Sequence, residues 1–352
     1  MRVMIVISNS GVGGSQRVAM HLAQWLEESA HHSCEIIALK PPTGESFDMN
    51  GYKFEEIQSN RVITELRSLI KSRRPDVLLS MGVPMCIYTV PACLFTKTKH
   101  IISERNDPSH FAGKSIIKYF SRLLMRLGDG FVFQTNDAKD FYGKRIANKA
   151  KVIANPLFNM ELMPENTYSG EREKNIVTVG RLNKQKNHIL LIEAFSKIIR
   201  KYPEYTLTIW GEGEERASLE KYIRELKLEN NVLLPGSTSD VFNNIYNAAL
   251  FVLSSDFEGM PNALMEAMAL GLPCIATDCP CGGPKDLIKD EYNGKLVPVG
   301  NIKLLANAME ELISNKNKAS EISKKATEIR KNYAPQTICS EWLAFFEKII
   351  GA

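Results

Sequence analysis

Short apolar runs alternate with longer amphipathic stretches along most of the chain. An uncharged apolar run of four to six residues is typical of a strand buried on both faces of a parallel sheet, and apolar residues three and four positions apart indicate a helix. Such strands are predicted at residues 3–7, 34–39, 77–81, 100–103, 131–134 and 152–153, with helices near 16–28 and 62–71. This alternation predicts a parallel sheet wrapped by helices.

The pattern stops at residues 155–175, which are polar and rich in turn formers, and this segment is predicted to be an interdomain linker. It restarts with predicted strands at 176–179, 206–210, 232–234, 249–253, 274–277 and 294–297. A chain of 352 residues also exceeds what one core usually organises. We therefore predict two Rossmann-like α/β domains in series, with the site in the cleft to which both sheets point their carboxyl ends.

Residues 77–96 form a stretch of 20 residues without a charge, long enough in principle to cross a membrane. Pro84 and Pro91 interrupt it. We favour a buried strand at 77–81 followed by a helix that opens near Pro84. The apolar stretch at the N-terminus is too short for a signal peptide and is interpreted as the first buried strand.

The overall composition, 44% apolar and 24% charged, is ordinary for a soluble globular protein, but its charge is unevenly distributed. Residues 1–156 carry 21 Lys and Arg against 14 Asp and Glu, whereas the remainder carries 23 against 26. The basic N-terminal half indicates an acidic surface or partner on that side.

Seven cysteines, an odd number without a regular framework, indicate a reducing compartment. Cys279 and Cys281 flank a proline, but no second Cys or Cys/His pair stands at metal-ligand spacing. This segment is therefore interpreted as a turn and not as a zinc site.

The strongest candidate chemistry lies where the predicted strand 249–253 gives way to a helix. Glu258 follows the strand, Pro261 fits the first helical position, and Glu266 lies more than one turn into the helix. Free N–H groups at such a helix start suit an anion. For either acid alone we favour a simpler interpretation, with Glu258 as an N-terminal acid stabilised by the helix dipole and Glu266 as a solvated helix residue.

A second candidate is the glycine-rich segment after the first strand, where Gly13 and Gly14 precede a helix and Arg17 adds positive charge. These glycines would let the backbone approach a phosphate or a sugar. A dinucleotide fingerprint is not met, because Gln16 occupies the place of its third glycine and the second strand ends at Lys40 without an acid. A tight turn without a ligand remains the alternative.

Arg181 and Lys186 leave the carboxyl end of the first strand in the second half, just before a helix. From there both could neutralise a diphosphate, although a solvated surface position is the common alternative for a lysine. Lys184 is assigned to that surface role, and His188, a lone histidine at the helix start, receives no chemical role.

Four strings in order along nearly the whole chain carry a family resemblance. They are Gly13 and Gly14 with Arg17, VGRLNKQKN at 179–187, FEGMPNALMEAMALGLP at 257–273 and CGGPKDLI at 281–288. Together they resemble the family 4 glycosyltransferases, retaining enzymes of the GT-B fold. This implies two Rossmann-like domains facing across a cleft, an N-terminal acceptor-side domain of residues 1–155 with a crossover helix at 336–352, and a nucleotide-sugar domain of residues 156–335.

The resemblance implies a role for each candidate in a nucleotide-sugar site. Glu258 would accept hydrogen bonds from donor-sugar hydroxyls, and Glu266 would hold the ribose hydroxyls. Amides around Met260 would meet the diphosphate, and Arg181 and Lys186 would stabilise the charge that grows on it. The whole implied donor set is Gly13, Gly14, Arg181, Lys186, Glu258, Gly259, Met260, Pro261, Asn262 and Glu266.

Two further features refine the expected chemistry. No Asp-x-Asp occurs in the sequence, so the usual metal clamp for the diphosphate is missing and we expect no metal and no other cofactor. Arg105 stands where many family members carry a histidine near the reacting sugar, and arginine cannot serve as a general base. A front-side retaining transfer, in which the leaving phosphate takes the acceptor's proton, needs no such base; His110 is an outside candidate.

The resemblance implies transfer of a hexose or N-acetylhexosamine from a UDP-linked sugar to a growing, lipid-linked glycan of a bacterial surface polysaccharide. Nucleic acid is not an expected partner. The alternatives are a nucleotide-sugar epimerase of the same architecture and a nucleotide-binding regulator without turnover. We expect a cytoplasmic protein that makes peripheral contact with the inner face of the membrane.

Residues 114–127 are predicted to form a helix with a basic stripe. Its four basic residues recur every fourth position and share one face, namely Lys114, Lys118, Arg122 and Arg126. Apolar residues fill the remainder of the helix. Two interpretations stay open: a core-packed helix whose basic stripe is merely solvated, and a basic face that docks on an anionic membrane.

Overall fold

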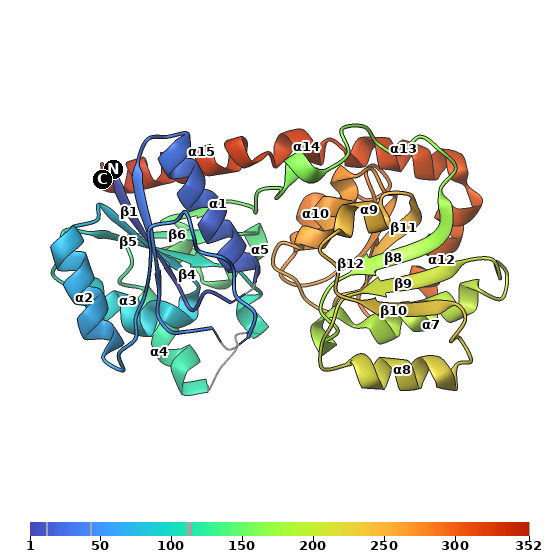
Figure 1. Ribbon diagram of the computed structural model, residues 1–352, viewed down its shortest axis with the longest axis horizontal. Helices are drawn as coiled ribbons and strands as arrows, with labels where there is room; N and C mark the ends of the chain where they lie inside the picture. Colours follow the sequence, from blue (N-terminus) through green and yellow to red (C-terminus); the bar gives the residue numbers. More distant parts are fainter. Residues whose placement is uncertain (12, 43, 111–114, 352) are drawn as a thin grey trace. The chain divides into compact units, whose positions relative to one another are not determined.

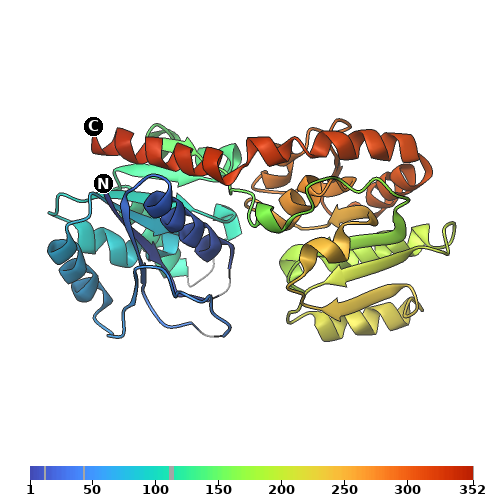
Figure 2. The same cartoon turned by 45° about the horizontal axis from the view of Figure 1, so that its top comes forward.

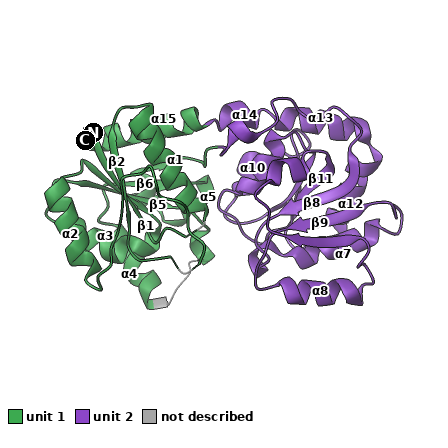
Figure 3. Ribbon diagram, in the orientation of Figure 1, with its two compact units in different colours: residues 1–156, 335–352 green, residues 157–334 purple. Residues whose placement is uncertain are grey.

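The computed structural model describes residues 1–11, 13–42, 44–110 and 115–351, and divides the chain into two compact units (Figure 1, Figure 3). Unit 1 comprises residues 1–156 and 335–352, and unit 2 comprises residues 157–334. These boundaries lie one residue from the division expected from the sequence.

Unit 1 is built on a seven-stranded sheet in the order β3-β2-β1-β4-β5-β6-β7, with every pair parallel. The strands are β1 (Arg2–Ile7), β2 (Ser33–Ala38), β3 (Phe54–Glu56), β4 (Val77–Met81), β5 (Lys99–Glu104), β6 (Gly130–Phe133) and β7 (Ala150–Val152). Five residues of β1 are buried and all of β4 is, as expected of strands covered on both faces. The edge strand β3 is an addition to the predicted set.

The helices of unit 1 form two groups. They are α1 (Gly14–Glu28), α2 (Val62–Arg73), α3 (Cys86–Cys93), α4 (Ser115–Met125), α5 (Asn136–Phe141), α6 (Lys144–Ala147) and α15 (Pro335–Ile350). α1 packs against α15, whereas α2, α3 and α4 pack side by side. Both chain ends lie close together in this unit (Figure 1, Figure 2).

The uncharged stretch 77–96 folds as predicted. It forms β4, a short 3-10 turn at Val83–Met85 and α3, which contains Pro91. None of the helices within the described residues is long and apolar enough to cross a membrane.

Unit 2 is built on a six-stranded parallel sheet in the order β10-β9-β8-β11-β12-β13. The strands are β8 (Glu173–Val179), β9 (Thr206–Trp210), β10 (Val232–Gly236), β11 (Ala248–Leu253), β12 (Cys274–Asp278) and β13 (Lys295–Pro298). Two parallel-sheet units thus confirm the predicted pair of Rossmann-like domains.

The helices of unit 2 also fall into two groups. They are α7 (His188–Ile198), α8 (Arg216–Glu225), α9 (Val241–Ile245), α10 (Asn262–Ala269), α11 (Gly283–Leu287), α12 (Ile302–Ser314), α13 (Lys316–Ala326) and α14 (Ile329–Asn332). α7 packs against α8 and α12, and α10 packs against α9, α13 and α14. A core of fully buried side chains, among them Phe195, Ile209 and Met309, joins the α7 group to the sheet.

The predicted linker, residues 155–175, is correct in part: the chain passes from unit 1 to unit 2 after Pro156, and residues 159–172 are mostly irregular and exposed, but both ends of the range belong to folded structure. Leu157 and Phe158 are buried, and residues 173–175 already belong to β8. The Arg172 guanidinium donates hydrogen bonds to the carbonyls of Tyr246, Ala248 and Gly271. Arg172 therefore belongs to the folded part of unit 2, although the polar composition of this segment predicts an exposed linker.

Candidate active site

The candidate site of unit 2 lies at the carboxyl ends of its two central strands. β8 is the first strand of this sheet, β9 lies on one side of it and β11 on the other. The segments that follow β8 and β11 therefore leave from a topological switch point, where open α/β sheets bind their ligands. Lys186 follows β8 and Glu258 follows β11.

Lys186 and Glu258 form an ion pair at this point. The Lys186 Nζ lies 2.6 Å from Glu258 Oε1, and the two side chains are only 14% and 8% exposed. Ser255 Oγ donates a hydrogen bond of 2.7 Å to the same carboxylate oxygen. Glu258 Oε2 has a weaker contact, at 3.4 Å from Gln185 Nε2, and so retains capacity to accept a hydrogen bond from a ligand hydroxyl.

Side-chain hydrogen bonds fix the two strand-end segments to each other. Ser254 Oγ donates to the Lys186 carbonyl at 2.9 Å, and Asn187 Nδ2 donates to Asp256 Oδ1 at 2.7 Å. Asn187 also caps α7 by accepting from the Leu190 N–H. The ion pair is therefore held in place before any ligand arrives.

The turn that carries Glu258 packs tightly against the segment after β12. The Glu258 N–H donates to the Pro280 carbonyl at 2.6 Å, and the Cys281 N–H donates to the Glu258 carbonyl at 2.9 Å. A Cβ added to Gly283 would lie 1.6 Å from the Gly259 carbonyl oxygen. Position 283 therefore needs glycine for this close approach of two backbones.

Two expectations about the helix after this turn are corrected. Pro261 is not the first helical residue but the N-cap, in an extended conformation, and α10 begins at Asn262. Glu266 is not a solvated helix residue, because it is 8% exposed and faces the interior with most of α10. Gly259, Met260 and Pro261 are buried as well, and Asn262 is partly exposed.

The segment after β8 also contains an exposed cation and a buried histidine. Arg181 is exposed, and within the described part of the chain its guanidinium forms no hydrogen bond or ion pair. His188 Nε2 lies 3.2 Å from the Arg181 carbonyl, which fixes the proton on that nitrogen, and burial lowers the pKa of His188 to about 4. His188 is thus neutral near pH 7 and supports the Arg181 backbone, while Lys184 is exposed.

The remaining predicted residues lie in unit 1, at the carboxyl edge of its sheet. Gly13 is the N-cap of α1 and Gly14 its first residue, and α1 is the helix that follows β1. Arg105 follows β5, two strands away. Its Nη2 donates to Asn155 Oδ1, and its guanidinium lies 5.9 Å from the Trp342 ring centroid. Burial of its guanidinium lowers the pKa of Arg105 to about 9, so the partly buried side chain is a cation at neutral pH.

Sequence reasoning missed Glu104, the last residue of β5. Tyr142 donates to Glu104 Oε2 at 3.1 Å and the Arg105 N–H donates to Oε1 at 3.0 Å. Burial raises the pKa of Glu104 to about 7. The available signal was an acid directly after the predicted strand 100–103, at a strand end as Glu258 is, although Glu258 lies five residues beyond its strand.

His110, the outside candidate, is paired with an acid. Its Nδ1 lies 2.8 Å from Asp107 Oδ2, and its side chain is about half exposed. Burial raises the pKa of Asp107, but hydrogen bonds from Ser109 and His110 outweigh it, so the pKa of Asp107 falls below its usual value.

The structure also bears on metal chemistry. Across the described residues, no group of three or more His, Cys, Asp and Glu side chains is arranged to hold a metal ion. All seven cysteines are unpaired and buried, and burial raises the pKa of Cys279 to about 12. Thiols of this kind are inert at neutral pH.

Three comparisons with known proteins bear on this site. Residues 160–329, nearly all of unit 2, match the family described as "Glycosyl transferases group 1". An uncharacterized glycosyltransferase of Haemophilus influenzae is 27% identical over 348 residues, which cover 96% of this chain and 97% of that one. The Campylobacter jejuni enzyme named GalNAc-alpha-(1->4)-GalNAc-alpha-(1->3)-diNAcBac-PP-undecaprenol alpha-1,4-N-acetyl-D-galactosaminyltransferase is 26% identical, with 100% of both chains covered.

Among solved structures, HepE of Anabaena in complex with UDP superposes with a TM-score of 0.83 at 17% identity, covering 99% of this chain and 100% of that one. At this identity the likeness shows the fold. It confirms the predicted GT-B class, two Rossmann-like domains in one chain.

Proposed function

We propose that this chain, whose residues 160–329 match the group 1 glycosyltransferases, transfers a hexose or N-acetylhexosamine from a UDP-linked sugar to a growing, lipid-linked glycan. The proposed binding of the sugar donor is supported by the buried ion pair between Lys186 and Glu258 at the switch point of unit 2. A cation and a carboxylate held 2.6 Å apart offer a nucleotide sugar one partner for its diphosphate and one for its hydroxyls.

The base and the acceptor are proposed from relatives. HepE, with the same fold, was solved with UDP, and the name of the Campylobacter relative gives it an acceptor on undecaprenyl diphosphate. We therefore propose a UDP-linked donor and an acceptor of the same lipid-linked kind. Glu266, buried one turn beyond the site, is the proposed partner of the ribose hydroxyls.

For the chemical step we propose transfer with retention at the anomeric carbon. The bond from this carbon to the diphosphate oxygen breaks, the acceptor oxygen bonds to the same face, and the acceptor's proton passes to the leaving diphosphate. Lys186 and Arg181 stabilise the negative charge that develops on that diphosphate. In this scheme no side chain serves as the base. Arg105 cannot be one, since its pKa of about 9 keeps it protonated.

Metal independence remains part of this proposal. Two cations near the strand ends, the Lys186 ammonium and the Arg181 guanidinium, supply the positive charge that a divalent ion would otherwise contribute. Activity retained in excess chelator supports this part, and activity restored only by a divalent ion contradicts it.

A donor and acceptor assay tests the proposed reaction. The protein is incubated with a panel of UDP-sugars, with and without an undecaprenyl-diphosphate glycan, and products are identified by mass and NMR spectroscopy. Sugar transfer with retained anomeric configuration supports the proposal. An epimerised nucleotide sugar formed without acceptor assigns the epimerase function instead, and binding without any product assigns a regulator.

The ribose role is tested by binding alone. Glu266→Ala is expected to weaken UDP affinity at least tenfold, because the nucleoside loses a buried carboxylate with two acceptor oxygens. Circular dichroism checks that the fold persists. Unchanged UDP affinity in a folded variant would remove this role from Glu266.

We also propose that the protein works at the inner face of the cytoplasmic membrane as a peripheral protein. A lipid-linked acceptor is presented at that surface, and the basic half of the chain is attracted by anionic lipid.

A further inference from the structure

α4 and the turn after it carry an apolar stripe on the outside of unit 1. Five side chains of the stripe are exposed: Ile116 by 63%, Tyr119 by 66%, Phe120 by 47%, Leu123 by 46% and Leu127 by 59%. Their spacing of three, one, three and four positions places them along one helical face, over about 16 Å. Large apolar side chains gathered on a surface in this way mark an interaction site.

The basic side chains of α4 turn toward the protein, contrary to the expected basic stripe. Lys118 Nζ donates to the Ser109 carbonyl at 3.2 Å. Arg122 Nη2 donates to the Pro108 carbonyl at 2.7 Å, and its guanidinium lies over the Phe141 ring. Arg126 is exposed, and Lys114 lies outside the described residues. The buried Ser121 and Met125 mark the inner face of the helix.

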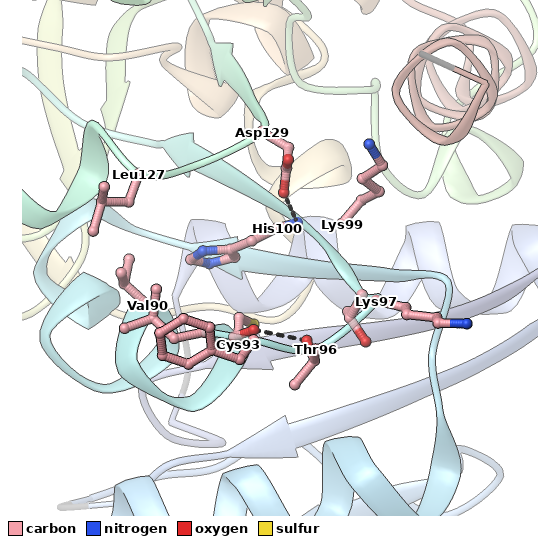
Figure 4. Close-up of a pocket in the computed structure, with 11 residues that line it drawn as sticks. Val90, Cys93, Thr96, Lys97, Lys99, His100, Leu127 and Asp129 are labelled. Carbon is pink, nitrogen blue, oxygen red and sulfur yellow. Dashed lines mark hydrogen bonds between the residues drawn. The ribbon is translucent and has the colours of Figure 1, made fainter.

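The apolar surface continues beyond α4 to the end of α3. Leu94 is 39% exposed and Phe95 is 97% exposed, in a left-handed conformation at φ 61°. Together with Leu127 they line a shallow pocket of about 280 Å³ (Figure 4). Lys97 and Lys99 lie at the same pocket, with their ammonium groups extending away from the apolar side chains.

The charges around this surface are mostly positive. Asp129, which lines the same pocket and is partly exposed, is an exception; it accepts a hydrogen bond of 2.8 Å from the His100 N–H. Residues 82–128 contain seven Lys and Arg and only two acids, Glu104 and Asp107. Both acids are buried, at 6% and 3% exposure, so the described part of this segment presents no carboxylate to solvent. An apolar stripe with aromatic residues and a cationic border matches the boundary between headgroups and acyl chains of an anionic bilayer.

We propose that this surface, defined by Leu94, Phe95, Ile116, Tyr119, Phe120, Leu123 and Leu127, docks on an anionic lipid bilayer, with α4 parallel to the membrane. The stripe enters the headgroup region and Lys97 and Arg126 meet the lipid phosphates. The proposal rests on the proposed function only for its purpose, which is to bring the enzyme to a lipid-linked acceptor. Docking itself needs neither donor nor acceptor.

Vesicle sedimentation tests this surface with the full chain. Wild type is expected to sediment with vesicles of phosphatidylcholine and phosphatidylglycerol at low salt and to bind pure phosphatidylcholine at least tenfold more weakly. A triple variant, Ile116→Ser with Phe120→Ser and Leu123→Ser, is expected to lose at least tenfold in binding to the anionic vesicles. These side chains are exposed, so the variant should fold, and retained UDP binding verifies it.

A matched variant controls for loss of surface hydrophobicity in general. Leu162→Ser, Leu233→Ser and Leu304→Ser remove exposed leucines of unit 2 and should leave vesicle binding unchanged. Phe120→Trp provides a second readout, because a tryptophan that enters the headgroup region shifts its emission to the blue and is quenched by brominated lipid.

Three outcomes would overturn the proposal: a wild type that ignores anionic vesicles, a triple variant that binds them as well as wild type, and a wild-type dimer that the triple variant abolishes in the absence of lipid. The last result would assign the surface to contact with a second copy. Because no nucleotide sugar is present, a failure here is separate from a failure of transfer, which is measured with a soluble acceptor.

Discussion

Lys186 and Glu258 show how two single residues build the centre of the proposed active site. The pair is nearly buried, and the carboxylate also accepts from Ser255. An ion pair of this kind contributes little net stability, because removing two charges from water offsets most of their attraction. Its value here is positional, since it places an ammonium group and a carboxylate where the ends of β8 and β11 meet.

Lys186→Ala is predicted to lower turnover by the equivalent of about 2–4 kcal/mol in activation free energy, as loss of one preorganised charge partner does. Lys184→Ala, two residues away and exposed, is the control and should keep normal turnover. The rates are measured with saturating donor and acceptor. Near-normal turnover of Lys186→Ala would return this lysine to a purely structural role beside Glu258.

Glu104 predicts a pH dependence of stability in unit 1. Burial raises its pKa from an ordinary value of 4.5 to about 7, so the folded state binds this proton more tightly than the unfolded state does. Stability is therefore highest below about pH 4.5 with respect to this group and falls as pH rises toward 7. The free energy of unfolding decreases by about 3 kcal/mol over this pH range because of this one group.

Glu104→Gln keeps the shape but cannot ionise, so it is expected to be more stable than wild type at pH 8 and similar at low pH. Urea unfolding in a Trp210→Phe background reports on unit 1 through Trp25 and Trp342. Glu45→Gln, at an exposed position, is the control and should change neither curve. If the unfolding free energies of Glu104→Gln and wild type depend on pH in the same way, ionisation of the Glu104 carboxyl does not destabilise the folded state, and the prediction is wrong.

The sequence predicts which residues leave the strand ends but not what their side chains contact. Lys186 and Glu258 could be placed at strand ends because buried strands are recognisable from uncharged apolar runs. The hydrogen bonds from Ser255 and Gln185 depend on side-chain orientation, and no pattern encodes it. For Arg105, its position after β5 was predictable, whereas its burial against Trp342 depends on a helix more than 200 residues away.

At the scale of elements, the strands covered on both faces were the most predictable, and edge elements the least. β3 is only three residues long and contains two glutamates, so its sequence lacks the apolar run that marks an inner strand. α4 shows a related limit. Apolar residues at helical spacing predict that one face differs from the other, but not which face is covered. The structure leaves several of its large apolar side chains outside.

α15, at the C-terminal end of the chain, covers part of the sheet that the N-terminal residues form. Trp342, Phe346 and Ile349 are buried on unit 1, and a Cβ on Gly130 would lie 3.0 Å from Ile349 and 3.1 Å from Phe345. The helix thus packs directly on the start of β6. It also contacts α1, where Trp25 Nε1 donates to Gln336 Oε1 at 2.6 Å.

Truncation after Pro335 is predicted to give insoluble protein, because the apolar surface that α15 covers becomes exposed. Replacing Trp342 by Ala alone should cost about 3–5 kcal/mol in unfolding free energy, as for other large buried side chains. Solubility after expression and urea unfolding are the measurements. Replacement of the exposed Glu347 by Ala is the control, and a soluble, active truncation would contradict the prediction.

The whole molecule is asymmetric in how its two units are built. Unit 1 needs two separate segments of the chain, whereas unit 2 is a single segment, residues 157–334, with its own core around β8, β9 and α7. The side chains proposed to contact the donor's diphosphate, sugar and ribose, namely Arg181, Lys186, Glu258 and Glu266, all belong to unit 2, whereas Gly13 and Gly14 of the expected donor set belong to unit 1. Net charge differs between the units in the same sense, since unit 1 carries 22 Lys and Arg against 16 Asp and Glu, whereas unit 2 carries 22 against 24.

Residues 157–334, produced alone, are therefore predicted to fold and to bind UDP with a dissociation constant within about tenfold of the full chain, a difference of about 1.4 kcal/mol or less. A continuous segment of this length can bury about 70% of its unfolded surface, which suffices for an independent core. Transfer should be absent, because unit 1, the expected acceptor side, is missing. Calorimetric titration with UDP measures the affinity, and the same fragment with Glu266→Ala is the control that ties binding to the proposed ribose partner. A folded fragment that does not bind UDP would show that unit 1 supplies essential donor contacts, with Gly13 and Gly14 at the start of α1 as the first residues to examine.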